Sequence, residues 1–490
     1  MKLVLSFFLC LSASILSANP SEAFYFSPQL TSAYTELLKL KTVRASGIIA
    51  ANLQKKPADG IAIYLENYID FIHLLISEDE NLYKQISDNE HLRLDKLRNL
   101  DKNSPYFLFT QAEIRLQWAM VKLRFGDNLG AARGFQKSYK LLKENEEKFP
   151  DFLPNKKTLG LLYVVLGAVP EKYHWLLNVF GLAGDTSKGW QYLKAASENA
   201  NPFQAEATLM YQLLRIYLLE ETEKPLAELK QMTLQSPDNL LFVTLYAMSS
   251  VKNSHSEEAL STLLNCPKSD EYVHVNFLEY LQAEIYLQKN DYSQALLHYY
   301  KFLQFHKGKN LKKDAYYKIF LANWLSSQNW QKNVHYLKKV QEVGQTLVEA
   351  DKYAEKFART HEILDVNLMK ARLAFDGGYY EEGLKMCGNF VVSEKNPKHN
   401  AEFFYRKGRI YHKINEIQKA IDLYKQAVKL SEVENYYFGA NAALQLAYIY
   451  KVRNDKIHAR LYFEKALSFK NHEYKNSIDS KAKSGLKDLK

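Results

Sequence analysis

The residue types that could do chemistry occur in this sequence without the spacing that most enzymes need. His361-Glu362 lacks the second His of a zinc-binding helix. The segment 184–189 has the two glycines of a phosphate loop, but Trp190 and Gln191 stand where Lys and Ser or Thr are required. No Gly-x-Ser-x-Gly elbow is present, and the 13 His form no cluster with Asp, Glu or Cys at ligand spacing. The sequence therefore predicts no catalytic residue, metal site or cofactor; the alternative is a hydrolase whose site is assembled from distant residues.

Basic and aromatic side chains near the C-terminus have a spacing that favours binding. The set is Arg372, Tyr405, Arg409, His412, Lys413, Asn441, Tyr448 and Lys451. Guanidinium, ammonium and ring groups together suit an acidic peptide or a chain-end carboxylate. The alternative is a solvated basic face with no ligand.

Helical repeats are the elements that would position these side chains. The segment from Ala401 supplies Gly408, Tyr411, Ala420, Tyr424 and Ala427, and the segment from Ala440 supplies Ala447, Tyr450, Ala459, Phe463 and Ala466. Small residues let two antiparallel helices approach, and large residues fill the space beside them. This is the pattern of a tetratricopeptide unit of about 34 residues. Weaker copies begin at residues 276, 314 and 364.

The predicted fold is therefore all-α, an α/α superhelical tetratricopeptide-type repeat array. In such arrays the first helix of each unit lines a concave groove, and the basic and aromatic set falls at groove positions. With only 19 Gly and 12 Pro in 490 residues, long helices joined by short turns are expected. The stretch from Gln328 to Thr360 can hold one long helix or two. The tail from Asn476 predicts a closing helix, with a disordered basic tail as the alternative.

The sequence divides into four segments by pattern. Residues 1–23 form a predicted signal peptide, 24–158 an N-terminal helical region with a degenerate repeat, and 159–275 a central helical segment with another. Residues 276–490 hold the C-terminal tetratricopeptide repeats and the capping helix.

The N-terminus has the features of a secretory signal peptide. Lys2 precedes an apolar run, and small residues follow it. Ser21 and Ala23 fit the cleavage rule, so cleavage is expected after Ala23, with Ala18 as the alternative. The chain is thus expected to be exported across the inner membrane of a bacterium, to the periplasm or beyond. No later segment reaches the ~20 apolar residues of a membrane span, so none is expected in the mature chain.

The formal net charge is +10, with basic and acidic residues interspersed. A nucleic-acid binder would concentrate its basic residues on one element with a reading motif. No such motif occurs, so nucleic acid is not an expected partner.

The central segment changes in pattern. An apolar helix from Leu159 is expected to lead to a turn at Pro170, a second helix ended by Gly181, and a third capped by Asp185. Gly160, Pro170, Phe180, Gly181, Gly184, Asp185, Gly189 and Leu193 carry a resemblance, as does the run 112–119. With these residues the sequence resembles the tetratricopeptide repeat protein 39 and inclusion body clearance family, whose members are intracellular. The resemblance implies helical-repeat architecture and an adaptor-like role.

The predicted function is a non-enzymatic protein-binding scaffold or adaptor in the bacterial envelope. The alternative is a periplasmic carrier of a hydrophobic or glycan ligand, held near residues 163–180. A closed apolar cavity there would favour the carrier, and a packed helix junction would favour the scaffold.

Overall fold

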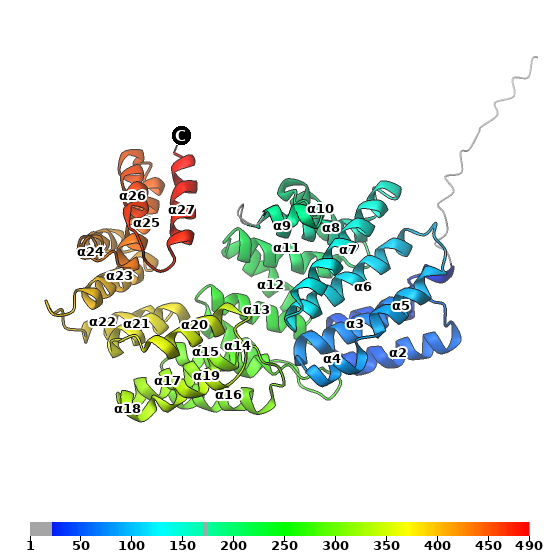
Figure 1. Cartoon of the computed structure of the whole chain (residues 1–490), viewed down its shortest axis with the longest axis horizontal. Coiled ribbons are helices and arrows are strands. Elements are labelled where there is room, and N and C mark those ends of the chain that lie inside the picture. The colour runs from blue at the N-terminus through cyan, green and yellow to red at the C-terminus, as the bar shows by residue number, and fades with distance from the viewer. Residues whose placement is uncertain (1–21, 170–173, 490) are drawn as a thin grey trace, which may run out of the picture. The chain divides into compact units, whose positions relative to one another are not determined.

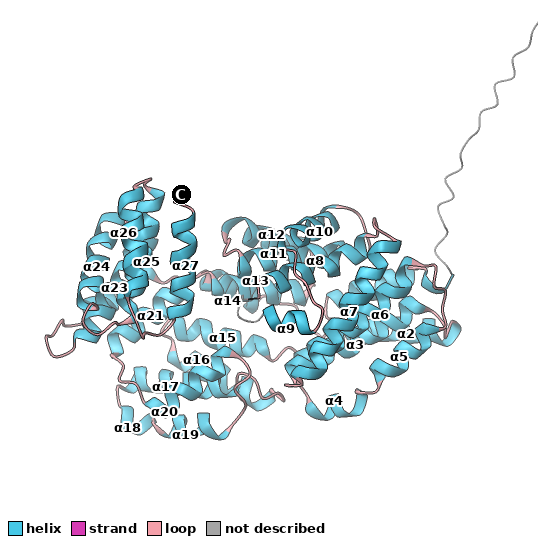
Figure 2. Cartoon of the chain, turned by 45° about the horizontal axis from the view of Figure 1, so that its top comes forward, coloured by secondary structure: helices cyan, strands magenta, loops and turns pink. Residues whose placement is uncertain are grey.

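The computed structural model describes residues 22–169 and 174–489, and the side chains of 174–176 are left out of the description. Within these ranges the chain contains helices, turns and loops but no strand (Figure 2). The predicted signal peptide, apart from Glu22 and Ala23, and the predicted turn at Pro170 lie outside the described residues. The all-α prediction is confirmed.

The chain forms two compact units, each described here by itself. Unit 1 comprises residues 1–72 and 84–211, and unit 2 comprises residues 73–83 and 212–490. The first helices are η1 (Glu22–Phe24), α1 (Pro28–Leu38), α2 (Thr42–Lys55), α3 (Gly60–Ser77), α4 (Glu80–Ile86), α5 (Asn89–Arg98), α6 (Pro105–Arg124), α7 (Asn128–Lys148), α8 (Leu153–Gly167), α9 (His174–Val179), α10 (Thr186–Glu198) and α11 (Gln204–Leu218) (Figure 1). Helices α3, α4 and α11 each cross a limit between the units. The predicted boundaries at 158/159 and 275/276 stay a prediction from the sequence pattern.

Unit 2 continues the helical series. Its helices are α12 (Glu223–Gln235), α13 (Leu240–Lys252), α14 (Ser256–Leu264), α15 (Phe277–Gln288), α16 (Tyr292–Phe305), α17 (Lys312–Ser327), α18 (Trp330–Asn333), α19 (His335–Glu342), α20 (Glu349–Thr360), α21 (Val366–Gly377), α22 (Tyr380–Gly388), α23 (Pro397–Lys413), α24 (Ile417–Leu430), α25 (Tyr437–Val452), α26 (Lys456–Ser468) and α27 (Lys475–Lys487). The stretch after Gln328 thus holds the short α18 followed by α19 and α20, not one long helix.

The repeat phasing is confirmed by burial at the helix crossings. Ala420 and Ala427 of α24 are fully buried, as are Ala447, Ala459 and Ala466 in the α25–α26 pair. A Cβ added to Gly408 of α23 would lie 2.9 Å from the Tyr424 ring, which a real contact essentially never allows. Small residues therefore set the spacing of each helix pair, and larger ones would push the helices apart.

The turn inside three of the repeats has a local signal in the sequence. Asn290, Asn415 and Asn454 adopt left-handed backbone conformations, with φ of 63°, 63° and 58°. Asn tolerates this conformation better than most residues, so it ends the first helix of a repeat sharply. Asp455 then caps α26 by accepting a hydrogen bond from His458 N at 3.1 Å.

The C-terminal helix α27 closes the array, as predicted. Ile478 and Ala482 face the last repeat and are buried. Gly485 lies so close to Phe463 that a Cβ there would be 2.2 Å from the ring. The helix covers an apolar face that no further repeat would cover.

Candidate functional site

Unit 2 contains a pocket of about 630 Å³, called here the large pocket to distinguish it from a smaller hollow beside it. Its walls come from α15, α17, α20 and α21, with Glu473 and Tyr474 from the loop before α27. Leu287, Leu321 and Met369 give it an apolar side. The first helices of three consecutive repeats, α15, α17 and α21, supply most of the lining, as expected for the concave face of such an array.

Charged and phenolic side chains form the floor of the large pocket. Lys318 pairs with Glu284 and, at 3.0 Å, with Asp314. Tyr280 donates a hydrogen bond to Asp314, and Tyr299 donates one to Glu284. These five residues are called the Lys318 cluster. They form a network in which each carboxylate accepts hydrogen bonds from both a lysine and a tyrosine.

Burial alone would lower the pKa of Lys318, but Asp314 and Glu284 raise it above its ordinary value. Burial also raises the pKa of Glu284, and Lys318 opposes this effect. Lys318 is therefore charged, and both carboxylates are engaged in holding it. Such an arrangement orients side chains for contact more readily than it supplies a free general base.

A second hollow of about 250 Å³, called here the arginine pocket, adjoins the first. Arg372, Asp376 and Tyr474 line both pockets, so the two are adjacent, and together they are called the groove. Arg409 and Asn441 complete the side of the arginine pocket that was predicted from groove positions. The lining thus includes guanidinium groups, an amide and phenol rings.

The guanidinium groups in this pocket differ in how far neighbouring carboxylates neutralise them. Arg406 is bound by Glu402. Arg372 has only Asp376, at 3.7 Å, and Arg409 donates a hydrogen bond to the Tyr405 hydroxyl at 2.8 Å. Within the described residues, no carboxylate pairs directly with Arg409.

Packing fixes the orientation of Arg409. Its guanidinium carbon lies 4.7 Å from the centroid of the Phe375 ring. A guanidinium stacked on a ring keeps its edge N–H groups free for an acceptor in the plane. The arginine pocket is therefore lined by the guanidinium groups of Arg372 and Arg409 and by one carboxylate, that of Asp376.

The structure brings four of the eight predicted binding residues together. Arg372, Tyr405, Arg409 and Asn441 all line the arginine pocket, although Tyr405 itself is largely buried. The other four, His412, Lys413, Tyr448 and Lys451, do not line it.

These four residues make other contacts or face solvent. Lys451 pairs with Asp488 of the C-terminal end at 2.6 Å, and Tyr448 packs edge-on against Phe463. Lys413 is exposed on α23. Burial, together with Arg409 and Lys413, lowers the pKa of His412, so His412 is neutral at pH 7.

The Lys318 cluster was not predicted, although the repeat spacing points to two of its residues. The ninth residue of the repeats that begin at 276 and 364 is Glu284 and Arg372, and the fifth residue of the repeat that begins at 314 is Lys318. All three line the large pocket. The signal was therefore present in the sequence.

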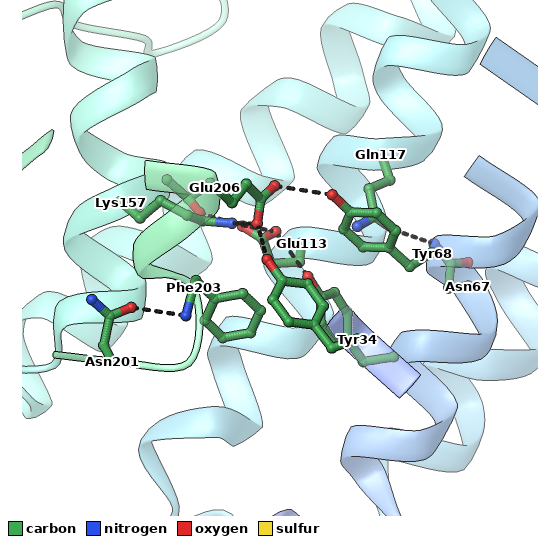
Figure 3. Close-up of polar contacts among 11 residues, drawn as sticks. Tyr34, Asn67, Tyr68, Glu113, Gln117, Lys157, Asn201, Phe203 and Glu206 are labelled. Carbon is green, nitrogen blue, oxygen red and sulfur yellow. Dashed lines mark hydrogen bonds and ion pairs between the residues drawn. The ribbon is translucent and has the colours of Figure 1, made fainter. Parts of the chain in front are cut away.

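Unit 1 contains a similar network that is closed to solvent (Figure 3). Lys157 lies 3.2 Å from Glu113 and 3.1 Å from Glu206, and its side chain is 1% exposed. Tyr34 and Tyr68 donate hydrogen bonds to Glu206 at 2.7 and 3.1 Å. These residues are called the Lys157 cluster. Because all of them are buried, they serve the fold of unit 1 and not a ligand in solution.

Helices α8 and α10 of the central segment form a packed junction. A Cβ on Gly160 of α8 would lie 3.0 Å from Gly189 O, and one on Gly189 of α10 would lie 2.9 Å from Gly160 O. Leu193 is fully buried beside them. As predicted, Asp185 caps α10 by accepting a hydrogen bond from Lys188 N at 3.0 Å, and Gly181 follows α9 with φ of 59°.

A membrane span and a metal-binding cluster are both absent from the described ranges, 22–169 and 174–489. No helix there is long and apolar enough to span a bilayer. Nor do the described side chains include a group of three or more His, Cys, Asp or Glu placed to hold a metal ion.

No family model matches the sequence, and no curated protein matches it. Among solved structures, the chain is similar to the crystal structure of the APC/C hetero-tetramer Cut9-Hcn1. The identity is 13% over 93% of this chain and 95% of that chain, with a TM-score of 0.28. A likeness at this level indicates no shared function. The helix pairs of unit 2, with small residues at their crossings, define this chain as a tetratricopeptide-type repeat protein at the level of fold.

Proposed function

We propose that this chain is a non-enzymatic scaffold or adaptor that binds an acidic segment of a protein partner in the groove of unit 2. The observation that carries the proposal is the arginine pocket. Arg372 and Arg409 both line one hollow, Asp376 lies 3.7 Å from Arg372, and Asn441 adds an amide. A partner carboxylate would complete the charge balance with charge-assisted hydrogen bonds, which are stronger than neutral ones.

The Lys318 cluster supports binding over catalysis. Glu284 and Asp314 converge on the large pocket, as a hydrolase would need, but both are held by Lys318 and by tyrosine hydroxyls. A carboxylate whose oxygens already accept hydrogen bonds from a lysine and a tyrosine has fewer lone pairs free to take up a proton. The groove then offers an apolar side and fixed charges, which suit a peptide.

The location in the cell is part of the same proposal. The N-terminal pattern of Lys2, an apolar run and Ser21-x-Ala23 favours export and processing after Ala23, into a bacterial periplasm or beyond. N-terminal sequencing of the cellular protein tests this, and recovery of chains that still begin at Met1 would contradict it.

The resemblance to the tetratricopeptide repeat protein 39 and inclusion body clearance family is proposed at the level of architecture. The close crossing of α8 and α10 at Gly160 and Gly189 is what supports it. That packed junction also favours the scaffold over a carrier with a cavity near residues 163–180.

The binding proposal is tested by removing the donors singly. Arg372→Gln and Arg409→Gln should each weaken binding of a fluorescein-labelled glutamate-rich peptide by about tenfold, because hydrogen bonds to charged groups are worth roughly 1.5–3 kcal/mol. Arg409→Lys should recover only part of the loss, since an ammonium cannot form the planar fork. Fluorescence anisotropy measures the affinity.

Lys413→Gln is the matched control. Lys413 lies on the same helix as Arg409 and loses the same charge, but it is exposed outside the pocket. Its affinity should stay within about twofold of wild type. Circular dichroism checks that each variant is folded. If the control and the pocket variants weaken binding equally, attraction is a property of overall charge, and the pocket is not the site.

A further inference from the structure

The loop between α26 and α27, residues 469–474, reaches the groove from the end of the array. Phe469 anchors its start and is 2% exposed, and Lys470 N donates a hydrogen bond to Asn435 Oδ1 at 2.9 Å. At its other end, Glu473 forms an ion pair with Lys356 of α20, which is 117 residues earlier in the chain. The loop therefore joins the last repeat to the wall of the large pocket.

The tip of this loop lies where the pockets meet. Glu473 and Tyr474 line the large pocket, and Tyr474 also lines the arginine pocket. The Tyr474 ring packs edge-on against Tyr437, with ring centroids 5.4 Å apart. A carboxylate and an aromatic ring from adjacent residues thus occupy part of a groove that Lys356, Arg372 and Arg409 also line.

The backbone at the tip is held in an unfavourable conformation. Tyr474 has φ of 61°, a left-handed conformation that is uncommon for a bulky residue, and its side chain is 54% exposed. Strain of this kind persists only where surrounding contacts hold the residue, and it is released when those contacts are exchanged. The contacts are weak ones, because Lys356 and Glu473 are 58% and 41% exposed.

We propose that Glu473 and Tyr474 act as an internal ligand of the groove. The true partner then carries the same pairing, a carboxylate next to an aromatic ring, and displaces them on binding. The carboxylate of the partner replaces Glu473 at Lys356, and its ring replaces Tyr474 against Tyr437. This inference rests on the proposed function and adds two features, the aromatic neighbour of the acidic residue and competition from within the chain.

The consequence is autoinhibition of modest size. An intramolecular group competes at a high effective concentration, so it lowers the affinity for a partner even when its own contacts are weak. Because an exposed ion pair contributes little, breaking it should tighten partner binding by about two- to fivefold.

The test uses the full mature chain and a fluorescein-labelled peptide of alternating glutamate and tyrosine. Glu473→Gln should bind this peptide about two- to fivefold more tightly than wild type, since the amide keeps the shape but loses the charge. Glu349→Gln is the matched control: Glu349 also lines the large pocket and pairs with a lysine, Lys352, but lies outside the loop. It should change affinity less than Glu473→Gln does.

Two comparisons complete the test. A peptide of alternating glutamine and tyrosine should bind poorly to every variant, and one of alternating glutamate and serine should bind less tightly than the tyrosine peptide. Hydrogen exchange of amides 471–474 should rise when the glutamate–tyrosine peptide is added, because the loop leaves the groove.

The outcomes separate the two proposals. If wild type and Glu473→Gln bind the glutamate–tyrosine peptide equally, or if exchange at 471–474 does not rise on binding, the internal ligand is refuted and the binding groove stands. If neither protein binds any acidic peptide, the proposed function fails, and the inference fails with it.

Discussion

Each unit of the molecule contains a lysine held between two carboxylates whose oxygens also accept hydrogen bonds from tyrosines. In unit 1 these are Lys157, Glu113 and Glu206, and in unit 2 they are Lys318, Glu284 and Asp314. The side chain of Lys157 is 1% exposed, whereas that of Lys318 is 17% exposed and lies on the floor of the large pocket. The two clusters are built from the same kinds of side chain, but solvent reaches only the Lys318 cluster.

The difference shows how one set of side chains serves two purposes. Burial raises the pKa of Glu113, and Lys157 opposes this, as Lys318 does for Glu284. In the closed cluster every polar group must be satisfied by the protein, so the network specifies how α6, α8 and α11 pack. In the open cluster water or a ligand can satisfy some of the same groups. A buried ion network is therefore a candidate site only where a pocket reaches it.

Replacing Lys157 should have the largest effect. Lys157→Met leaves Glu113 and Glu206 buried together without a counter-charge, which should destabilise unit 1 by about 3–5 kcal/mol. The Met side chain also loses the contact of the ammonium with the Phe203 ring, 4.9 Å away. The midpoint of urea unfolding, followed by circular dichroism, measures the loss.

Lys148→Met is the matched control in the same unit. Lys148 pairs with Glu144 at 2.6 Å, and both side chains are about half exposed. This variant should cost less than about 1 kcal/mol. Similar midpoints for the two variants would show that the Lys157 cluster contributes no more than a surface pair.

The repeats of unit 2 could be predicted from the sequence because their determinants are local. Small residues at the repeat spacing mark a helix crossing, and Gly408, Ala420 and Ala427 mark one such crossing. Arg372 and Arg409 could be placed in a groove for the same reason. Their positions within a repeat fix which way they point.

The Lys157 cluster and the ion pair of Lys356 with Glu473 could not be predicted, because their partners come from distant parts of the chain. Tyr34 and Glu206 are 172 residues apart, and Lys356 and Glu473 are 117 apart. No local spacing connects such pairs. Lys451 was misleading for a related reason: its position fits the groove, but Asp488 from the end of the chain holds it elsewhere.

A pH dependence should appear beside the open cluster. The Asp351 carboxylate accepts hydrogen bonds from Leu311 N at 2.7 Å and Asp314 N at 2.9 Å. Burial raises the pKa of Asp351 from 3.8 to about 6, against the effect of these two bonds. Between these values the folded carboxyl keeps a proton that the unfolded chain has lost. The free energy of unfolding should therefore fall as pH rises through this window, by roughly 3 kcal/mol.

Asp351→Asn removes this titration. As pH rises from 4 to 6, wild type should lose stability relative to Asp351→Asn. Above pH 6 the difference between their unfolding midpoints should stay constant. The opposite result would be a wild type that gains stability relative to the variant over the same range. It would mean that the two backbone N–H groups keep Asp351 ionised in the folded protein.

Replacing Lys318 should have the smallest effect and is the most direct test of the comparison. Lys318→Met leaves Glu284 and Asp314 without their cation, as Lys157→Met does for its neighbours. Water in the large pocket can hydrate these carboxylates, and Glu284, whose pKa is already raised by burial, can take up a proton. The cost should therefore be only about 1–2 kcal/mol. Lys352→Met breaks an exposed ion pair with Glu349, so it should cost less than Lys318→Met or Lys157→Met.

The stability lost in Lys318→Met, compared with that lost in Lys157→Met, decides whether the two clusters serve different purposes. Glu284→Gln should recover part of the loss in Lys318→Met, because one uncompensated charge is removed. If Lys318→Met instead costs as much as Lys157→Met, water does not reach the floor of the large pocket. The Lys318 cluster would then be a second closed network that only holds the repeats together, and the ligand would have to be sought at the arginine pocket alone.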